Sequence, residues 1–317
     1  MGSNCSCLDS VTLHEYSENA IERVVKQKQN RINPMQSVIR IQACWRGYKV
    51  RKQRQYNLPD YSNSLTRATE LKLGNFKYAD GNFRPHKPHK YDNDAVYWGE
   101  MNRDLVREGR GMQVWPDGTK YEGYWKRDMA NGKGRLIHAD GDAYEGDWLD
   151  DKAHGKGIYW HADGAKFEGE WVADKQHGNG VETWPDGAKY TGQYIEGKKQ
   201  GFGEFHWADG STYKGEFLDN HLHGKGTYAW ADGRSYSGTW KDNKMHGTGT
   251  FTWPDGHTYT GDYYQDRKHG NGVFTWPQGR KFIGKWVNGK QHGKGLLELP
   301  SGERRTDVYL NGEILKC

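Results

Sequence analysis

The sequence predicts an all-β repeat array: an elongated, twisted, single-layer antiparallel sheet of stacked β-hairpins, preceded by a basic N-terminal α-helix. Three observations predict this fold class. Only 34% of the 317 residues are hydrophobic, whereas soluble globular chains usually reach about 45 to 50%. The 14 Trp, 20 Tyr and 9 Phe together equal the 43 glycines in number. A Tyr/Phe-x-Gly unit recurs with a period of 23 residues, and a fixed period of this length is typical of repeat proteins.

The first element, residues 1–20, is expected to be acylated and mostly disordered. Met1-Gly2-Ser3-Asn4-Cys5-Ser6 fits the N-myristoylation pattern, with Gly2 as the acceptor, and Cys5 and Cys7 are candidate palmitoylation sites. Myristate alone binds membranes weakly, so palmitate or a basic segment is needed as a second signal. The alternative is that Gly2 is only the small residue that follows an excised Met.

Residues 21–57 form the second element, a basic helical segment. Residues 21–54 contain ten Lys/Arg and one acid, which predicts an acidic partner such as a protein or a lipid surface. Asn33-Pro34 is a helix-start signal, and Asn57-Leu58-Pro59 closes the helix.

This helix contains a run that resembles the IQ motif, which binds calmodulin and related EF-hand light chains. The residues that the resemblance implicates in binding are Ile41, Gln42, Trp45, Arg46, Gly47 and Arg51. Apolar residues fall on one helical face, and the surrounding Lys and Arg offer charge partners to acidic EF-hand lobes. The implied partner is calmodulin or a calmodulin-like EF-hand protein. The alternative is a basic amphipathic helix that docks on the array or on lipid.

The third element, residues 58–95, is predicted to be a linker. Its segment 74–81 imitates the second half of a repeat and is either a degenerate starting strand or a chance similarity. Residues 82–94 contain Pro85 and Pro88, which favour an insertion or linker.

Residues 96–302 are predicted to form nine repeats, each a β-hairpin. Both runs of a repeat alternate with period two, placing rings and glycines on one face and Glu, Lys and Thr on the other. The tip sequence Trp-Pro-Asp-Gly, as at 253–256, predicts a turn in which Gly takes positive φ. Each strand glycine is expected to lie under a ring from a neighbouring strand. The repeats begin at Tyr97, Tyr121, Tyr144, Phe167, Tyr190, Tyr213, Tyr236, Tyr259 and Phe282.

The repeat resembles the MORN family (membrane occupation and recognition nexus), whose unit is nearly copied by Tyr144-Glu-Gly-Asp-Trp148 and His154-Gly-Lys-Gly157. Glu182 departs from the pattern because it occupies a ring position. The resemblance implies an elongated sheet used as a scaffold in membrane junctions, ciliary radial spokes and parasite cytoskeletons. It also implies that a helix or loop of another protein binds the aromatic face. The candidate contact residues are Tyr144, Trp148, Trp184, Trp207, Tyr213, Trp230, Tyr236, Trp240 and Trp253.

The last element, residues 303–317, is predicted to be a charged closing strand and a tail. Arg305, Asp307 and Tyr309 stand where a further repeat would begin. Charge on an end strand discourages edge-to-edge association.

The sequence offers no sign of catalysis, and we expect no catalytic residue, metal or cofactor. The recurring histidines, such as His223 and His246, are interpreted as turn residues because corresponding sites on successive hairpins lie too far apart to share one ion. Nucleic acid is not expected as a partner, because residues 96–317 carry 30 Lys/Arg against 32 Asp/Glu.

The predicted function is a non-enzymatic, membrane-tethered scaffold at the cytoplasmic face of a membrane, in the cell cortex or a cilium. It binds an EF-hand protein through the IQ helix, a protein helix or loop through the array, and the membrane through acyl chains and the basic segment. The sequence leaves open whether the chain also forms a homodimer. The alternatives are a cytoskeletal or axonemal component resembling a radial spoke, and a phospholipid-binding module.

Overall fold

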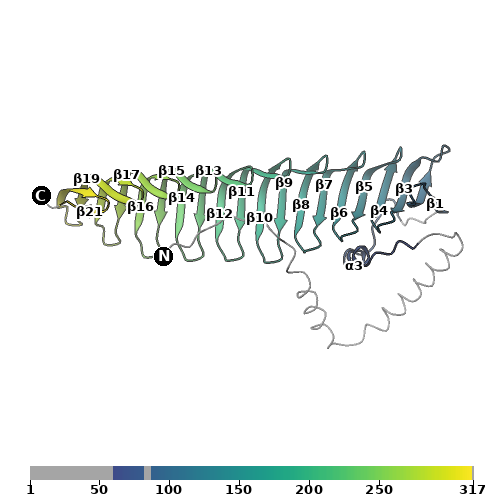
Figure 1. The fold of residues 1–317 in the computed structure, drawn as a ribbon, viewed down its shortest axis with the longest axis horizontal. Helices are drawn as coiled ribbons and strands as arrows, with labels where there is room; N and C mark the ends of the chain where they lie inside the picture. Colours follow the sequence, from purple (N-terminus) through teal and green to yellow (C-terminus); the bar gives the residue numbers. More distant parts are fainter. Residues whose placement is uncertain (1–59, 82–86, 316–317) are drawn as a thin grey trace, which may run out of the picture. The chain divides into compact units, whose positions relative to one another are not determined.

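A computed structural model describes residues 60–81 and 87–315 of the chain. The described residues fall into two compact units. Unit 1 contains the residues up to 151 together with 161–163, and unit 2 contains 152–160 together with the residues from 164 onward. Figure 1 labels the helix and the strands of both units.

Unit 1 is an antiparallel sheet with one helix against it. Its strands pair in sequence order, from β1 with β2 to β5 with β6. The elements are α3 (Ser64–Leu73), β1 (His89–Lys90), β2 (Val96–Met101), β3 (Arg107–Val114), β4 (Lys120–Lys126), β5 (Met129–Ile137) and β6 (Ala143–Leu149).

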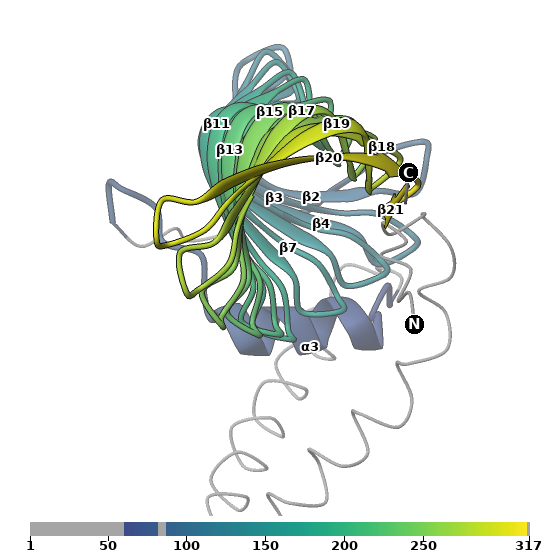
Figure 2. The same ribbon diagram turned by 90° about the vertical axis from the view of Figure 1, so that its left-hand side faces the viewer.

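Unit 2 is an antiparallel sheet in which each strand again pairs with the next along the chain. Figure 2 shows the twist of its successive strands. The first eight strands are β7 (Lys152–Trp160), β8 (Lys166–Val172), β9 (Lys175–Thr183), β10 (Lys189–Ile195), β11 (Lys198–His206), β12 (Thr212–Leu218), β13 (His221–Ala229) and β14 (Ser235–Lys241). The others are β15 (Lys244–Thr252), β16 (Thr258–Tyr264), β17 (Arg267–Thr275), β18 (Lys281–Val287), β19 (Lys290–Glu298), β20 (Arg304–Leu310) and β21 (Glu313–Ile314).

Two kinds of turn join the strands, and both follow from turn chemistry. Asp219 and Asn220, between β12 and β13, both have positive φ, 49° and 69°, as a two-residue hairpin turn requires. The tip that begins at Trp253 is closed by the Gly256 N–H, which donates to the Trp253 carbonyl oxygen at 3.0 Å. Gly256 has φ 88°, so the positive φ predicted for the tip glycine is confirmed.

The predicted division of each hairpin into a ring face and a polar face is also confirmed. Along β12, Tyr213 and Phe217 are buried, whereas Lys214 between them is exposed. Tyr213 is directly paired with Tyr228 of β13, and Gly215 with Gly226. Because paired residues share a face, rings and glycines collect on one side of the hairpin.

The ring over each glycine pair belongs to the same hairpin as the two glycines. It covers the glycine of its own strand as well as the glycine of the neighbouring strand, whereas the sequence suggested only the second contact. A Cβ built on Gly226 would lie 2.6 Å from Cε2 of Tyr213, and one on Gly215 would lie 2.6 Å from its Oη. The Tyr213 hydroxyl donates to the Glu216 carbonyl oxygen at 3.0 Å. Tyr213 thus folds back over its own strand and the paired strand, in a space that only glycine leaves open.

Successive hairpins are also joined at their turns. The Asn220 N–H donates to the Lys199 carbonyl oxygen at 3.1 Å, and the Lys199 N–H donates to the Asn220 side-chain oxygen at 2.8 Å. Asp174 makes the same pair of bonds with Ala153, at 3.0 and 2.7 Å. The second turn residue therefore connects each hairpin to the one before it.

The predicted linker at 58–95 contains a docked helix, which corrects the sequence interpretation. The Asn63 side chain caps α3 by accepting from the Leu65 and Thr66 N–H groups, and Gly74 ends it with φ 76°. Residues 74–81 contain no strand, so the degenerate starting strand suggested there is wrong. β1, a two-residue strand, begins at His89 instead.

The helix α3 lies beside hairpin tips of unit 1 (Figure 1). The Thr66 hydroxyl is buried and donates to the Gly118 carbonyl oxygen at 3.0 Å. Glu70 Oε1 lies 2.6 Å from Nζ of Lys120 in a largely buried ion pair. Residues 60–81 therefore cover polar side chains of this unit.

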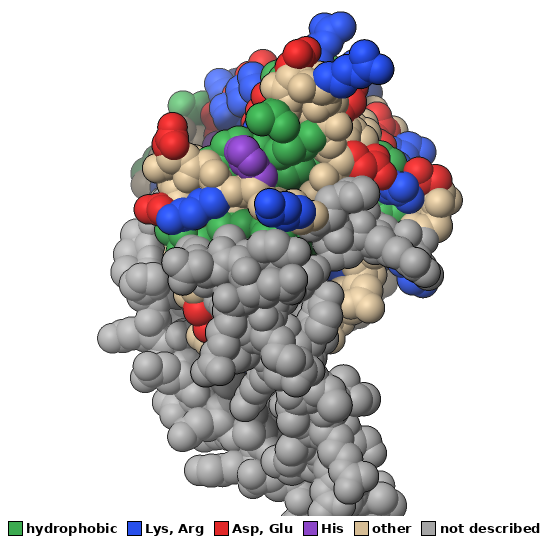
Figure 3. Space-filling model, turned by 90° about the vertical axis from the view of Figure 1, so that its right-hand side faces the viewer, with side chains coloured by type: hydrophobic (Ala, Val, Ile, Leu, Met, Phe, Trp, Pro, Cys, Tyr) green, Lys and Arg blue, Asp and Glu red, His purple; other side chains and the backbone are tan. Residues whose placement is uncertain are grey.

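Charged side chains mark the end strands of both units. Charges of both signs surround hydrophobic side chains at the end of unit 1 that contains β1 (Figure 3). In β20, Arg305 Nε lies 2.8 Å from Asp307 Oδ2, and β21 pairs only with Tyr309 and Leu310. The closing strand predicted after residue 302 is thus present, and the predicted all-β class of stacked antiparallel hairpins is confirmed.

Candidate partner-binding site

The ring face of unit 2 contains a fully buried row. In each repeat the ring that begins the first strand contacts the ring four residues later, edge to face, as between Tyr213 and Phe217 at 5.2 Å. Tyr213 also meets Trp240 of the next repeat at 5.7 Å and 90°. The Trp240 Nε1–H donates to the Gly226 carbonyl oxygen at 3.1 Å. This row acts as the hydrophobic core, because edge-to-face rings bury large areas in favourable geometry.

A second row of rings, at the tip end of the same face, is largely half-exposed. Its neighbours along the row are 4.4 to 5.7 Å apart between ring centroids. Phe251 is buried and the other rings are partly exposed. We call this the outer ring row: Trp184, Phe205, Trp207, Tyr228, Trp230, Phe251, Trp253, Phe274 and Trp276. Half-exposed aromatic rings of this kind are the residues most enriched in protein interfaces.

Two lysines of unit 2 place their ammonium groups over rings. Lys199 Nζ lies 5.2 Å from the Trp184 ring and 2.7 Å from Glu182 Oε2. Lys268 Nζ lies 4.7 Å from the Trp253 ring, and burial lowers the pKa of Lys268 to about 8. The repeat pattern alone did not point to either lysine, although both depart from the apolar or Gln residues at the equivalent positions of other repeats.

The structure separates the nine predicted array residues into two groups. The five residues Tyr144, Trp148, Tyr213, Tyr236 and Trp240 are buried, at 0 to 8% exposure. They hold the hairpins together and offer little surface to a partner. The four half-exposed residues, all in the outer ring row of unit 2, are Trp184, Trp207, Trp230 and Trp253.

The predicted lipidation sites Gly2, Cys5 and Cys7 lie outside the described residues. So do the six predicted calmodulin-binding residues, Ile41, Gln42, Trp45, Arg46, Gly47 and Arg51. Within residues 60–81 and 87–315, no helix has the length and apolar character needed to cross a bilayer.

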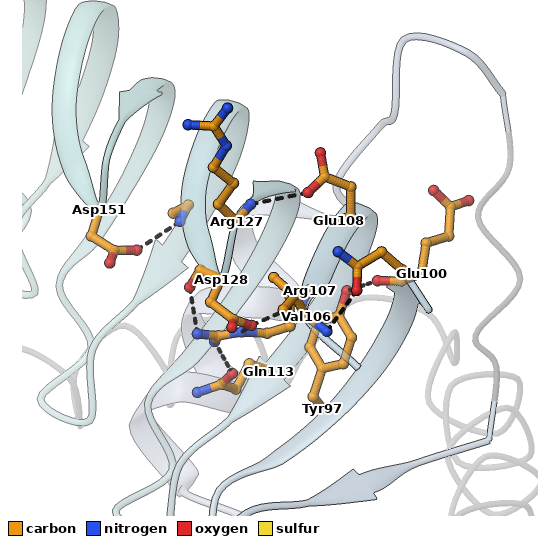
Figure 4. A network of polar contacts seen from close by, with 11 residues as sticks. Tyr97, Glu100, Val106, Arg107, Glu108, Gln113, Arg127, Asp128 and Asp151 are labelled. Carbon is orange, nitrogen blue, oxygen red and sulfur yellow. Dashed lines mark hydrogen bonds and ion pairs between the residues drawn. The ribbon is translucent and has the colours of Figure 1, made fainter. Parts of the chain in front are cut away.

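Unit 1 has a polar network beside a cavity of about 320 Å³, whose lining includes Tyr91, Arg107 and Gln113. Arg107 donates from Nε to Asp128 Oδ1 at 3.1 Å and also binds Gln113 (Figure 4). Its guanidinium lies 4.1 Å from the Trp125 ring centroid. Arg107 is therefore fully engaged within the protein, and the network stabilises the first hairpins.

The recurring histidines lie in strands and not in turns. His223, for example, is the third residue of β13 and is paired with Glu216 across a register shift. No group of His, Cys, Asp or Glu among the described residues has the arrangement of a metal site.

The stacked hairpins and their ring-on-glycine packing define a class of β-repeat protein. The MORN repeat family model matches nine segments, at 106–120, 121–143, 144–166, 167–189, 190–212, 213–233, 236–258, 259–279 and 282–304. These matches cover more than half of the chain, and the chain belongs to the MORN-repeat family. The IQ calmodulin-binding motif model matches residues 35–53. No curated protein matches the sequence.

Several solved structures show weak similarity. The CPAP G-box domain, described as a microcephaly protein domain, is 17% identical, with a TM-score of 0.34 over 64% of this chain and 100% of that one. The TCP10 domain of Danio rerio CPAP is 14% identical, with a TM-score of 0.35 over 71% and 100%. The SAS-4 TCP domain of Drosophila melanogaster, in complex with a proline-rich motif of Ana2, is 11% identical, with a TM-score of 0.24 over 66% and 88%.

Proposed function

We propose that this protein is a non-enzymatic scaffold tethered to the cytoplasmic face of a membrane. It binds a calmodulin-type EF-hand protein through residues 35–53 and a helix or loop of another protein through the outer ring row. The observation that carries the proposal is the pairing of an IQ motif with nine MORN repeats in one chain. Both kinds of module are typically non-catalytic, which supports a role in binding.

Calmodulin binding rests on the residues of the IQ match. Ile41 and Trp45 supply apolar contacts, and Arg46 and Arg51 supply positive charge to the acidic EF-hand lobes. The double variant Ile41→Ala, Arg46→Ala is expected to lose capture on calmodulin resin, both with calcium and with a chelator.

The matched control for this experiment removes one apolar side chain and one positive charge outside the motif. Val24→Ala with Lys26→Ala meets this condition and should leave capture unchanged. Equal capture of the wild type and the IQ double variant would remove the calmodulin assignment.

Protein binding by the array rests on exposure. Trp207 and Trp230 are half-exposed members of the outer ring row, and Trp is enriched among the few residues that supply most of the binding energy at protein interfaces. A random dodecapeptide phage library selected on the full chain is the probe. Selected peptides should lose binding to the double variant Trp207→Ala, Trp230→Ala.

The control variant for this selection alters the polar face of the repeat that contains Trp230. Lys214→Ala with Thr227→Ala alters two exposed side chains there and should leave peptide binding intact. Peptides that bind the tryptophan variant as well as the wild type would refute the outer ring row as the binding surface.

Membrane attachment rests on Gly2, Cys5, Cys7 and the basic segment 21–54. Intact-mass spectrometry of protein made in a myristoylating host should show one myristoyl group on the wild type and none on Gly2→Ala. The acylated protein should float with anionic vesicles. An unmodified wild-type N-terminus would remove the tethering proposal and favour the cytoskeletal or ciliary alternative.

A further inference from the structure

One lysine in the outer ring row lacks the negative partner that its counterpart has. Lys199 and Lys268 are the second residues of β11 and β17 and stand at the same repeat position. Lys199 is paired with Glu182 at 2.7 Å. The residue that corresponds to Glu182 in the repeat before Lys268 is Phe251, whose side chain is apolar and cannot form an ion pair.

Rings from three repeats surround the ammonium group of Lys268. Its Nζ lies 4.6 Å from the Phe274 ring centroid, 4.7 Å from Trp253, 5.0 Å from Trp286 and 5.1 Å from Tyr259. No carboxylate of the described residues lies within ion-pair distance of it. The rings attract the charge, but desolvation still lowers the pKa of Lys268 to about 8. The cation is therefore stabilised less well here than in water.

The surface beside Lys268 is apolar. Trp253 and Phe274 belong to the outer ring row, with centroids 5.7 Å apart, and Trp276 follows at 4.7 Å from Phe274. Lys268 itself is partly exposed, so a ligand can reach it. A positive charge set among half-exposed rings matches a ligand that carries one negative group between apolar groups.

We propose that the outer ring row around Lys268 binds an acidic, apolar peptide segment of another protein, with one Asp or Glu carboxylate on Lys268 and flanking apolar side chains on Trp253 and Trp276. This inference rests on the proposed partner-binding function of the row and adds the chemical class of the partner. A carboxylate on Lys268 forms the charge-assisted contact that Glu182 already gives Lys199.

The chain's own basic segment, residues 21–54, does not fit this position. This segment contains ten Lys/Arg and one acid, so it would bring positive charge to Lys268. Repulsion between like charges excludes it as the natural occupant. The basic segment is therefore not the occupant of this surface.

The experiment uses the full chain and the same dodecapeptide library, selected in parallel on the wild type and on Lys268→Met. Met is a suitable replacement because Met245 stands at this position in the preceding repeat. Peptides from the wild type should be enriched in Asp or Glu flanked by apolar residues, and those from Lys268→Met should not. In fluorescence titration, wild-type peptides should bind Lys268→Met about tenfold more weakly.

Lys199→Met is the matched control, because Glu182 already neutralises Lys199. Peptides selected on Lys199→Met should contain the acidic residue, as those selected on the wild type do. An equal proportion of Asp and Glu in the peptides selected on the wild type and on Lys268→Met would overturn the inference. If those peptides still depended on Trp207 and Trp230, the proposed partner-binding function would be retained. If no selected peptide depended on these tryptophans, both the partner-binding function and the inference about Lys268 would be refuted. Self-association of the wild type that Lys268→Met abolishes would also overturn it, because the occupant would be a second copy.

Discussion

The clearest test of the ring-on-glycine packing is the substitution Gly226→Ala. The new Cβ would lie 2.6 Å from Cε2 of Tyr213, far inside contact distance, so the ring must leave its place. Gly226 does not have a positive φ, and alanine is otherwise better than glycine in a strand by about 0.5 to 1 kcal/mol. Any large loss of stability therefore reports the displaced ring.

The magnitude follows from what Tyr213 loses. The side chain is 0% exposed, and full burial of a large apolar side chain contributes about 1.5 to 3 kcal/mol. Its hydrogen bond to Glu216 contributes about 1 kcal/mol, and its edge-to-face contacts with Phe217 and Trp240 about 0.5 to 1.5 kcal/mol each. Because the strands relax partly and alanine itself favours the strand, we expect a net loss of about 3 to 5 kcal/mol.

The assay is urea unfolding followed by tryptophan fluorescence, combined with hydrogen exchange of the strands β12 and β13, because repeat arrays unfold in parts. The control is a double-mutant cycle with Tyr213→Ala. In that background the ring is absent, and Gly226→Ala should cost nothing or stabilise slightly. A cost below about 1 kcal/mol in the wild type, or the same cost with and without Tyr213, would refute the packing argument.

Three further predictions concern the turns, the docked helix and pH. Asp174→Gly keeps the positive φ of the turn, as Gly197 does in the next repeat, but removes the 2.7 Å hydrogen bond that the Ala153 N–H donates. Chemical unfolding should show a loss of stability of about 1 kcal/mol, and an unchanged unfolding midpoint would contradict this prediction. Glu70→Gln removes the carboxylate 2.6 Å from Lys120 Nζ and leaves Glu122 at 3.0 Å, so unit 1 should lose about 1 kcal/mol. Limited proteolysis should then cut within 60–81 earlier than in the wild type, and identical cleavage would count against docking. Burial raises the pKa of the core tyrosines, so above pH about 10 the unfolded chain loses phenolic protons that the folded chain keeps, and stability falls as pH rises. Full phenolate absorbance should appear only together with the loss of β circular dichroism in an alkaline titration, and ionisation of all the tyrosines while the sheet persists would contradict the burial.

The hairpins were predictable because their signals are local. Alternation with period two determines which residues share a face, and the Pro254-Asp255-Gly256 tip encodes its own turn. The helix α3 also has local signals, the Asn63 cap and Gly74 at its end. They stand in the predicted linker 58–95, where the resemblance of the adjoining segment 74–81 to half a repeat favoured a different interpretation.

The division of the ring face into a buried row and the outer ring row was not predictable from alternation. Tyr213 and Tyr228 are cross-strand partners on one face, and period two makes them equivalent. They differ because Tyr213 folds over Gly226, whereas Tyr228 stands beside the tip, where it contacts Trp230 at 4.5 Å. Burial here depends on contacts across strands, which the pattern of one strand does not contain.

Differences between repeats carry the information that the shared pattern lacks. The first ring of each repeat is buried and lies over the glycine pair, with the same contacts from repeat to repeat. These positions therefore stabilise the sheet without distinguishing partners. The second residue of the longer strand varies instead: Ala130, Ala153, Gln176, Lys199, Leu222, Met245, Lys268 and Gln291. In unit 2 this position lies beside the rings, where its charge and size alter the surface without disturbing the hairpin. Partner specificity in such an array is therefore expected at this position, and Lys268 is where the chain leaves a charge for a partner to neutralise.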